Sequence, residues 1–255
     1  MKFAKYEAHG EVAYGVVEGD TIQQITTSPF EEYKITDHSH GLDEVKLLAP
    51  VLPRKIVAIG LNYKSHLGDA KPPAVPEPFF KTSSAIISAN EDIVIPREAL
   101  QQGINVQEEA ELTLVIGKTC KRATRSEALN YVLGYTCGND VSARPWQSGD
   151  LSWWRAKSSD TFAPIGPFIV TGLDPSNLGL SARINDRTVQ NASTSDLIHD
   201  VPTIIEFVSS VMTLEIGDII MTGTPGQPED ISPGDTVEIE VEGVGILRNS
   251  VTAEA

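Results

Sequence analysis

Apolar and polar residues alternate along much of the chain, and this alternation predicts β-strands more often than helices. The pattern is clearest near the C-terminus, in Thr236–Glu242 and Gly245–Val251. Shorter apolar runs predict further strands at Lys2–Tyr6, Val12–Val17, Thr21–Ile25, Lys55–Gly60, Ala85–Ser88, Ile93–Ile95, Glu111–Gly117, Phe168–Thr171, Ala182–Asn185 and Gly217–Gly223. The proline-rich residues 70–78 predict a loop.

Two segments have the apolar spacing of amphipathic helices. Thr124–Gly134 begins with capping residues and ends at glycine. Asp200–Met212 carries Pro202 in its first turn and apolar residues along one side. Many strands and few helices favour a mostly-β (α+β) protein over a parallel α/β repeat. We expect a small β-rich N-terminal domain at residues 1–50 and a larger domain at residues 51–255.

Composition and charge narrow the class of protein. The 255 residues suffice for a full hydrophobic core. A net charge of -15 disfavours nucleic acid and anionic membrane surfaces as partners. Cys120 and Cys137 lack a CxxC spacing, the N-terminus has no apolar signal core, and no apolar run is long enough to span a membrane. We therefore expect a reduced, cytoplasmic protein.

Three acidic residues are candidates for a metal site. Glu109 and Glu111 are two residues apart, so in an extended segment their side chains share one face. Asp140 follows Asn139 where a second strand ends. From spacing alone, the two glutamates also fit a solvated strand end, and Asp140 also fits a turn. If they converge, an all-carboxylate site suits Mg²⁺, Mn²⁺ or Ca²⁺ better than Zn²⁺.

Five motifs follow one another along the chain: Gly60–His66, Glu109–Leu112, Gly138–Arg144, Lys157–Pro167 and Gly217–Pro225. Together, and in this order, they resemble the fumarylacetoacetate hydrolase superfamily. The resemblance covers about residues 54–250. Residues 1–50 resemble the short N-terminal extension of bacterial members, which are described as 2-hydroxyhepta-2,4-diene-1,7-dioate isomerases or acylpyruvate hydrolases.

The resemblance implies a fold, a metal and a set of site residues. Members fold as a mixed β-sandwich roll and are usually homodimers. Matching positions imply that Glu109, Glu111 and Asp140 bind the metal, Mg²⁺ or Mn²⁺, with Ca²⁺ as an alternative. Contacts to a small 2-oxo acid are expected from Lys157, which would act catalytically, and from Arg144, Gln147, Gly223 and Thr224. In Thr222–Gly226, backbone N–H groups and a hydroxyl would face a substrate carboxylate.

His66 and Asp69 are the candidate catalytic pair. At positions i and i+3 of a helical turn they would share one face, and the acid could hold the imidazole as a base that activates water. Hydrolytic members have a His and a Glu at this spacing on a mobile lid. Here the acid is Asp, which is one methylene shorter. The remaining histidines lack such a partner, and we expect His9, His38 and His40 on the surface.

The expected reaction passes through a metal-stabilised enolate of a 2-oxo acid. Our first expectation is C–C bond hydrolysis of an acylpyruvate or a fumaryl-type diketo acid. The alternative is an isomerase or decarboxylase acting on 2-hydroxyhepta-2,4-diene-1,7-dioate or an oxaloacetate-like substrate. A third alternative, from another class, is a catalytically silent protein that binds small acids.

Overall fold

Most strands belong to one long mixed sheet. The computed structural model describes residues 1–255. The order across this sheet is β4 (Ile35–Gly41), β3 (Thr21–Ile25), β2 (Glu11–Glu18), β1 (Lys2–Ala8), β14 (Ala163–Val170), β12 (Val132–Asn139), β11 (Ala110–Ile116), β17 (Ile219–Met221), β6 (Ile56–Gly60) and β7 (Glu77–Lys81). In addition, β5 (Lys46–Leu48) pairs with β1, and β8 (Ile86–Ile87) pairs with β14.

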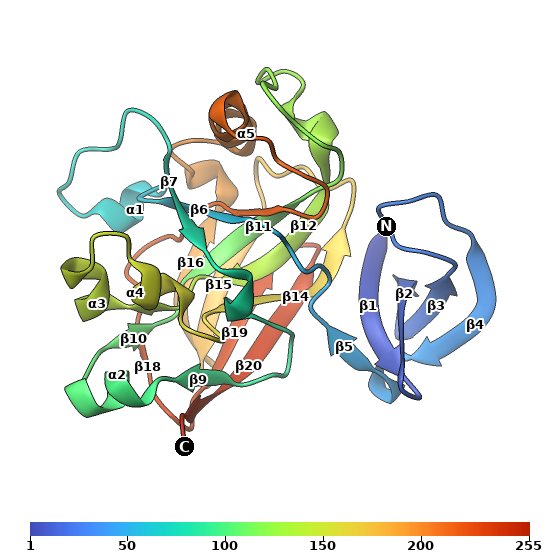
Figure 1. Cartoon of the computed structure of the whole chain (residues 1–255), viewed down its shortest axis with the longest axis horizontal. Helices are drawn as coiled ribbons and strands as arrows, with labels where there is room; N and C mark the ends of the chain where they lie inside the picture. Colours follow the sequence, from blue (N-terminus) through green and yellow to red (C-terminus); the bar gives the residue numbers. More distant parts are fainter.

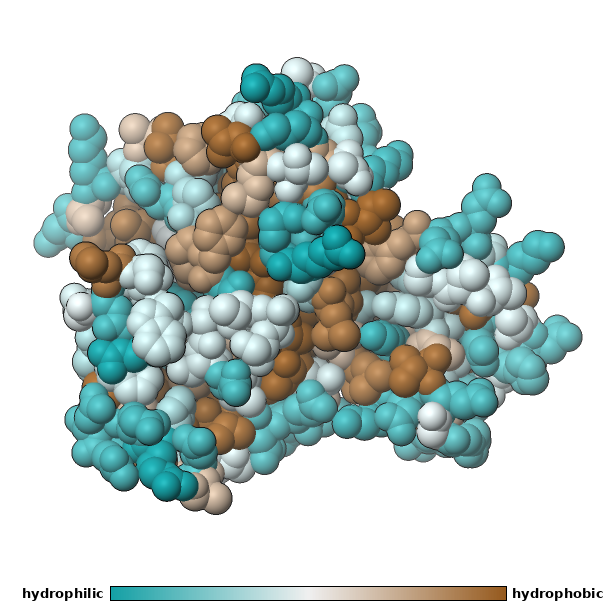
Figure 2. Space-filling model, in the orientation of Figure 1, coloured by the Kyte–Doolittle hydropathy of each residue, from teal (hydrophilic) through white to brown (hydrophobic).

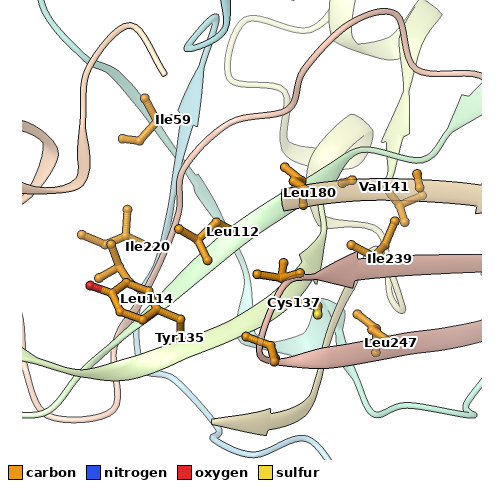
Figure 3. Close-up of a cluster of buried hydrophobic side chains, with 14 of the residues drawn as sticks. Ile59, Leu112, Leu114, Tyr135, Cys137, Val141, Leu180, Ile220, Ile239 and Leu247 are labelled. Carbon is orange, nitrogen blue, oxygen red and sulfur yellow. The ribbon is translucent and has the colours of Figure 1, made fainter. Parts of the chain in front are cut away.

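A second sheet packs against the middle of the first. Its order is β16 (Arg187–Ser193), β15 (Gly179–Ile184), β19 (Thr236–Val241), β20 (Gly245–Ala253) and β9 (Ile93–Ile95). The inward-facing side chains of both sheets form the main core, in which Leu112 and Cys137 cluster with Leu180, Ile239 and Leu247 (Figure 3). A small third sheet contains β13 (Ser142–Ala143), β10 (Val106–Gln107) and β18 (Asp230–Ile231). The predicted mostly-β (α+β) class is confirmed.

The first fifty residues form a lobe that continues the long sheet. Figure 1 shows β1 to β4 at the right of the molecule, while α1 (Lys64–Leu67), α3 (Arg144–Gly149) and α4 (Trp154–Ser158) lie at the left. The lobe joins the rest where β1 pairs antiparallel with β14, with Phe3 opposite Ile169. Phe3 and Val16 share a buried cluster with Ile165 and Ile169, so apolar packing crosses this junction. The domain boundary at residue 50 stays a prediction.

One of the two helix predictions is confirmed, and the other is wrong. Helix α5 (Val201–Val211) begins where predicted, with the Asp200 side chain accepting a hydrogen bond from the Thr203 N–H. The predicted helix at Thr124–Gly134 is a 3₁₀ turn at Ala128–Tyr131 followed by strand β12. The strand forms because it pairs with β11 along its length, and these hydrogen bonds outweigh the local helical pattern.

Several elements were not predicted from the hydrophobic pattern. Strands β4 and β16 carry mostly polar residues, and helices α2 (Arg97–Gln102), α3 and α4 are only one to two turns long. Strand β7 begins inside the predicted proline-rich loop, at Glu77. None of the helices has the length and apolar character needed to cross a membrane.

Figure 2 shows where the surface of this face is polar and where it is apolar. Hydrophilic side chains cover most of the outer edges, and hydrophobic ones emerge in a band through the centre. Beneath the surface, every residue of β11 is buried: β12 and β17 flank the strand, and β15 and β19 of the second sheet pack against it. A carboxylate on this strand must therefore find partners within the protein.

Candidate metal centre

Strands β11 and β12 bring the three acids together. The two strands are antiparallel, and Glu111 lies opposite Gly138 near the start of one and the end of the other. Glu109 and Asp140 flank the paired region, and the Asp140 N–H donates to the Glu109 carbonyl at 3.0 Å. The Glu109 N–H donates to the Asn139 side-chain oxygen at 3.0 Å. The register of one strand pair thus joins acids about thirty residues apart.

Glu109, Glu111 and Asp140 form a buried carboxylate cluster. One carboxylate oxygen from each lies within 4.8 Å of the others, and no side chain is more than 5 % exposed. Burial, followed by the negative charges of Asp140 and Glu109, raises the pKa of Glu111 well above its usual range. Mg²⁺, Mn²⁺ and Ca²⁺ prefer several oxygen ligands, and such an ion would offset the repulsion between these three carboxylates.

Two buried lysines contact the carboxylates and bind different oxygens of Asp140. Lys157 Nζ lies 2.8 Å from Glu109 Oε2 and 2.7 Å from Asp140 Oδ2. Lys81 Nζ lies 2.5 Å from the other Asp140 oxygen, Oδ1. Burial opposes the charge on Lys157, but Asp140 and Glu109 hold its pKa above the ordinary value. For Lys81 burial dominates and lowers the pKa. No chemical role was predicted for Lys81 from the sequence.

Arg144 connects the carboxylates to helix α3. Its guanidinium donates to Glu109 Oε1 at 2.5 Å, to Gln107 Oε1 at 2.6 Å and to Gln147 Oε1 at 2.9 Å. Although burial raises the pKa of Glu109, Lys157 and Arg144 lower it to about 2. Arg144 therefore holds both a carboxylate of the cluster and the Gln147 amide, which also lines the cavity.

The Thr222–Gly226 turn faces the cluster in a different way from the one predicted. The Gly223 N–H donates to Glu111 Oε2 at 2.6 Å, so it fixes a carboxylate of the protein. Gly223 has a φ of +102°, and a Cβ there would lie 2.8 Å from the Asn62 Cβ. Thr224 does line the cavity, and its hydroxyl accepts a hydrogen bond from Gln190 Nε2 at 2.9 Å.

The structure places His66 at the cavity but not beside Asp69. Helix α1 ends at Leu67, and Gly68 follows with a φ of +56°. Asp69 therefore lies beyond the helical turn, is exposed, and makes no hydrogen bond to the imidazole. His66 Nδ1 instead lies 2.7 Å from the Gly226 carbonyl oxygen. Because a carbonyl only accepts, Nδ1 carries the proton and Nε2 is left as the basic nitrogen.

These side chains surround one cavity of about 170 Å³. Its charged and polar lining consists of the three acids with Lys157, Arg144, Gln147, His66 and Thr224. Its apolar wall comes from Ile59, Leu61, Phe79 and Trp153, and the last two rings pack edge-to-face at 5.3 Å. A larger hollow beside α5 contains neither the acids nor a histidine. The enclosed carboxylates, cations and imidazole make the smaller cavity the candidate site.

Comparison with known proteins decides the family. Residues 55–252 match the family described as fumarylacetoacetate (FAA) hydrolase, C-terminal, and residues 1–50 match the family described as Rv2993c-like, N-terminal. The chain belongs to the fumarylacetoacetate hydrolase family. The predicted family and its mixed β-sheet fold are therefore confirmed, and the carboxylate cavity lies within the matched C-terminal region.

Similar proteins of this family have different reactions in their names. The structure of 5-carboxymethyl-2-hydroxymuconate delta-isomerase from Mycobacterium smegmatis is 42% identical, with a TM-score of 0.93 over 100% of both chains. That of maleylpyruvate hydrolase from Sphingobium sp. SYK-6, in complex with manganese(II) and pyruvate, is 30% identical, with a TM-score of 0.83 over 100% of both chains. The mitochondrial oxaloacetate tautomerase fahd2 of Xenopus laevis is 37% identical over 84% of this chain and 70% of its own.

Proposed function

We propose that this protein is an Mg²⁺- or Mn²⁺-dependent enzyme that moves a proton at C3 of a small 2-oxo acid, as in keto–enol isomerisation. The proposal is carried by one observation: a single cavity combines a three-carboxylate cluster with a histidine whose Nε2 is unpaired. Glu109, Glu111 and Asp140 would hold the ion. When bound, a divalent cation polarises the keto group and so lowers the pKa of the neighbouring C–H.

The charge of the cavity supports an anionic substrate. Three carboxylates are balanced by Lys81, Lys157 and Arg144, so these six groups sum to zero when all are ionised. A divalent ion then leaves a surplus of two positive charges, which matches a 2-oxo dicarboxylate. Lys157 and Arg144 are the cations that also line the cavity, and with Gln147 and Thr224 they would orient the carboxylates of the substrate.

His66 would be the group that carries the proton. The Gly226 carbonyl fixes its ring through Nδ1, which leaves Nε2 to accept a proton from C3 and deliver it to the keto oxygen, so that the enol forms; the reverse transfer regenerates the ketone. The apolar wall of Ile59, Phe79 and Trp153 would limit access of water to the reacting carbon. Proton transfer of this kind needs no second acid to orient the imidazole.

C–C bond hydrolysis is the second candidate. Its support is the 0.83 TM-score to maleylpyruvate hydrolase, together with His66 as a base for water. It ranks second because His66 is held by a carbonyl, and Asp69 lies outside the cavity. A carboxylate partner would stabilise an imidazolium during water activation more strongly than a carbonyl does.

A substrate panel separates the two reactions. Enzyme with Mg²⁺ or Mn²⁺ would be mixed with oxaloacetate, with 2-hydroxyhepta-2,4-diene-1,7-dioate and with short acylpyruvates, while enol absorbance, pyruvate and CO₂ are followed separately. We expect faster enol decay without stoichiometric pyruvate release, and loss of this activity in Glu111→Gln. Pyruvate release from acylpyruvates would favour the hydrolase. Absence of turnover on every substrate, with metal bound, would support a silent binding protein.

We also propose that the enzyme is a homodimer. Phe80, Leu151 and Trp154 are large apolar side chains that are each more than half exposed. They lie on or next to α3, α4 and β7, and α4 packs against both other elements. Such a group of exposed apolar side chains fits a subunit interface. Light scattering would test this, with Leu151→Glu expected to shift the mass toward that of one chain.

A further inference from the structure

A hollow in the N-terminal lobe gathers three of the five histidines of the chain. It measures about 290 Å³ and is lined by His9, His38 and His40, together with Glu11, Gln24, Tyr6 and three small or apolar residues. It shares no residue with the carboxylate cavity. Figure 1 places strands β1 to β4 at the opposite side of the molecule from α1, which carries His66.

The curvature of the four-stranded lobe brings the histidines together. His9 lies in the turn between β1 and β2, with a φ of +53°. His38 and His40 are two residues apart on β4, so their side chains share one face of the strand. Strands β1 and β4 are separated by β2 and β3 in the sheet. The sheet nevertheless curls enough to bring the His40 ring within 5.6 Å of the Tyr6 ring on β1 and 5.8 Å of the His9 ring, measured between centroids.

The spacing of His9 and His40 suits two imidazoles on one ion. A zinc-bound nitrogen lies about 2.1 Å from the metal, and the ring centroid lies roughly 1.1 Å further. Two rings on a tetrahedral ion then have centroids about 5.2 Å apart, and on opposite sides of an ion about 6.4 Å apart. The observed 5.8 Å falls between these limits, so the two rings would share an ion once the exposed His9 and the half-buried His40 rotate their nitrogens toward it.

Tyr6 is an independent sign of a missing polar partner. Its side chain is 1% exposed, it lines the hollow, and its hydroxyl makes no hydrogen bond. A buried hydroxyl without a partner is uncommon, because its lost hydration must be replaced. A water molecule held by an ion in the hollow would supply that partner.

We propose that this hollow is a second metal site, for a borderline divalent ion such as Zn²⁺ or Ni²⁺. His9, His38 and His40 would supply nitrogen ligands, with Glu11 as an oxygen ligand. Imidazole selects these ions over Mg²⁺ and Mn²⁺, so the site differs in preference from the carboxylate cluster. Bound metal would fasten the β1–β2 turn to β4 and so stabilise the curl of the lobe.

Zinc binding to the full chain tests the proposal. Equilibrium dialysis would be performed on Glu111→Gln, which disables the carboxylate cluster, and on the same protein with His9→Asn or His40→Asn added. Asparagine tolerates a positive φ, so His9→Asn removes the imidazole without straining the turn. His199→Asn is the matched control, since His199 lies outside the hollow and instead contacts the Pro73 carbonyl.

We expect one zinc per chain in the Glu111→Gln protein and in its His199→Asn derivative. His9→Asn and His40→Asn should each weaken binding at least about tenfold, which corresponds to about 1.4 kcal/mol. Circular dichroism would show that the His9→Asn lobe is folded. Zinc affinity unchanged in His9→Asn, or reduced equally in His199→Asn, would overturn the proposal.

Discussion

Replacement of Lys81 by methionine tests the charge balance of the carboxylate cluster. Lys81→Met keeps the length of the side chain but removes the ammonium that lies 2.5 Å from Asp140 Oδ1. Both side chains are at most 1% exposed, so water cannot replace the lost contact. Removing one partner of a buried pair typically destabilises a protein by about 3–5 kcal/mol.

The structure favours the lower end of that range. Lys157 Nζ remains 2.7 Å from the second Asp140 oxygen, so Asp140 keeps one cation. We expect a loss of about 3 kcal/mol in the free energy of unfolding, which in a chain of this size lowers Tm by roughly 6–12 °C. The measurement is thermal unfolding in EDTA, with and without added Mn²⁺ in excess of the chelator.

Added Mn²⁺ should stabilise Lys81→Met more than it stabilises the wild type. The variant lacks one positive charge next to the ion, so a divalent cation should bind about tenfold tighter or better and restore most of the lost stability. Lys46→Met is the control, because its 3.2 Å pair with Glu91 is 58%/37% exposed and should change stability by less than about 1 kcal/mol. The reasoning would be refuted if Lys81→Met had the same Tm as the wild type in EDTA. It would also be refuted if Mn²⁺ raised the Tm of both proteins equally.

Four further substitutions test the site and its surroundings. Burial raises the pKa of Glu108 from 4.5 to about 8, so the folded protein retains a proton that the unfolded chain releases and stability falls as pH rises between these values. Urea unfolding in EDTA at pH 5 and pH 8 should show a loss of about 3–4 kcal/mol from this group in the wild type, and a correspondingly smaller loss in Glu108→Gln. His66→Ala should lower kcat for enol decay by about 10²–10⁴-fold, whereas Asp69→Asn should change kcat less than about threefold. Equal losses of kcat in the two variants would show instead that His66 and Asp69 act as a catalytic pair. Gly223→Ala, which places a Cβ 2.8 Å from Asn62 at a φ of +102°, should destabilise the fold by at least about 2 kcal/mol in chemical denaturation.

The sequence pattern predicted the fold correctly where the local residues and the tertiary contacts favour the same secondary structure. Alternation in β19 and β20 corresponds to alternating burial, and Asp200 caps α5 as expected. At Thr124–Gly134 the two preferences conflict. The chain has helical apolar spacing there, but Val132 onward pairs with β11 and extends the main sheet. The strand partner is distant in sequence, so no local window contains the deciding interaction.

The site shows the same division between local and distant information. Family resemblance pointed to the three acids, and their convergence follows from the β11–β12 register. Lys81 was missed because a lysine near serines and threonines at a strand end is typical of a solvated surface. Only the packing of β7 beside β6 carries it to Asp140. The helical spacing of His66 and Asp69 predicted that they share one face. This prediction failed because Gly68 adopts a positive φ and the helix ends before Asp69.

The candidate metal-binding acids and the histidine proposed to carry the proton lie on parts of the molecule that differ in how firmly they are packed. Glu111 belongs to the fully buried strand β11 and Glu109 directly precedes it, whereas His66 lies on a single four-residue turn that leads into a proline-rich segment at the edge of the sheet. Mutations at that edge can therefore accumulate without unfolding the core. On the proposed function, related chains could keep the same carboxylate cluster while their reactions differ, which would fit the different reactions named for similar proteins.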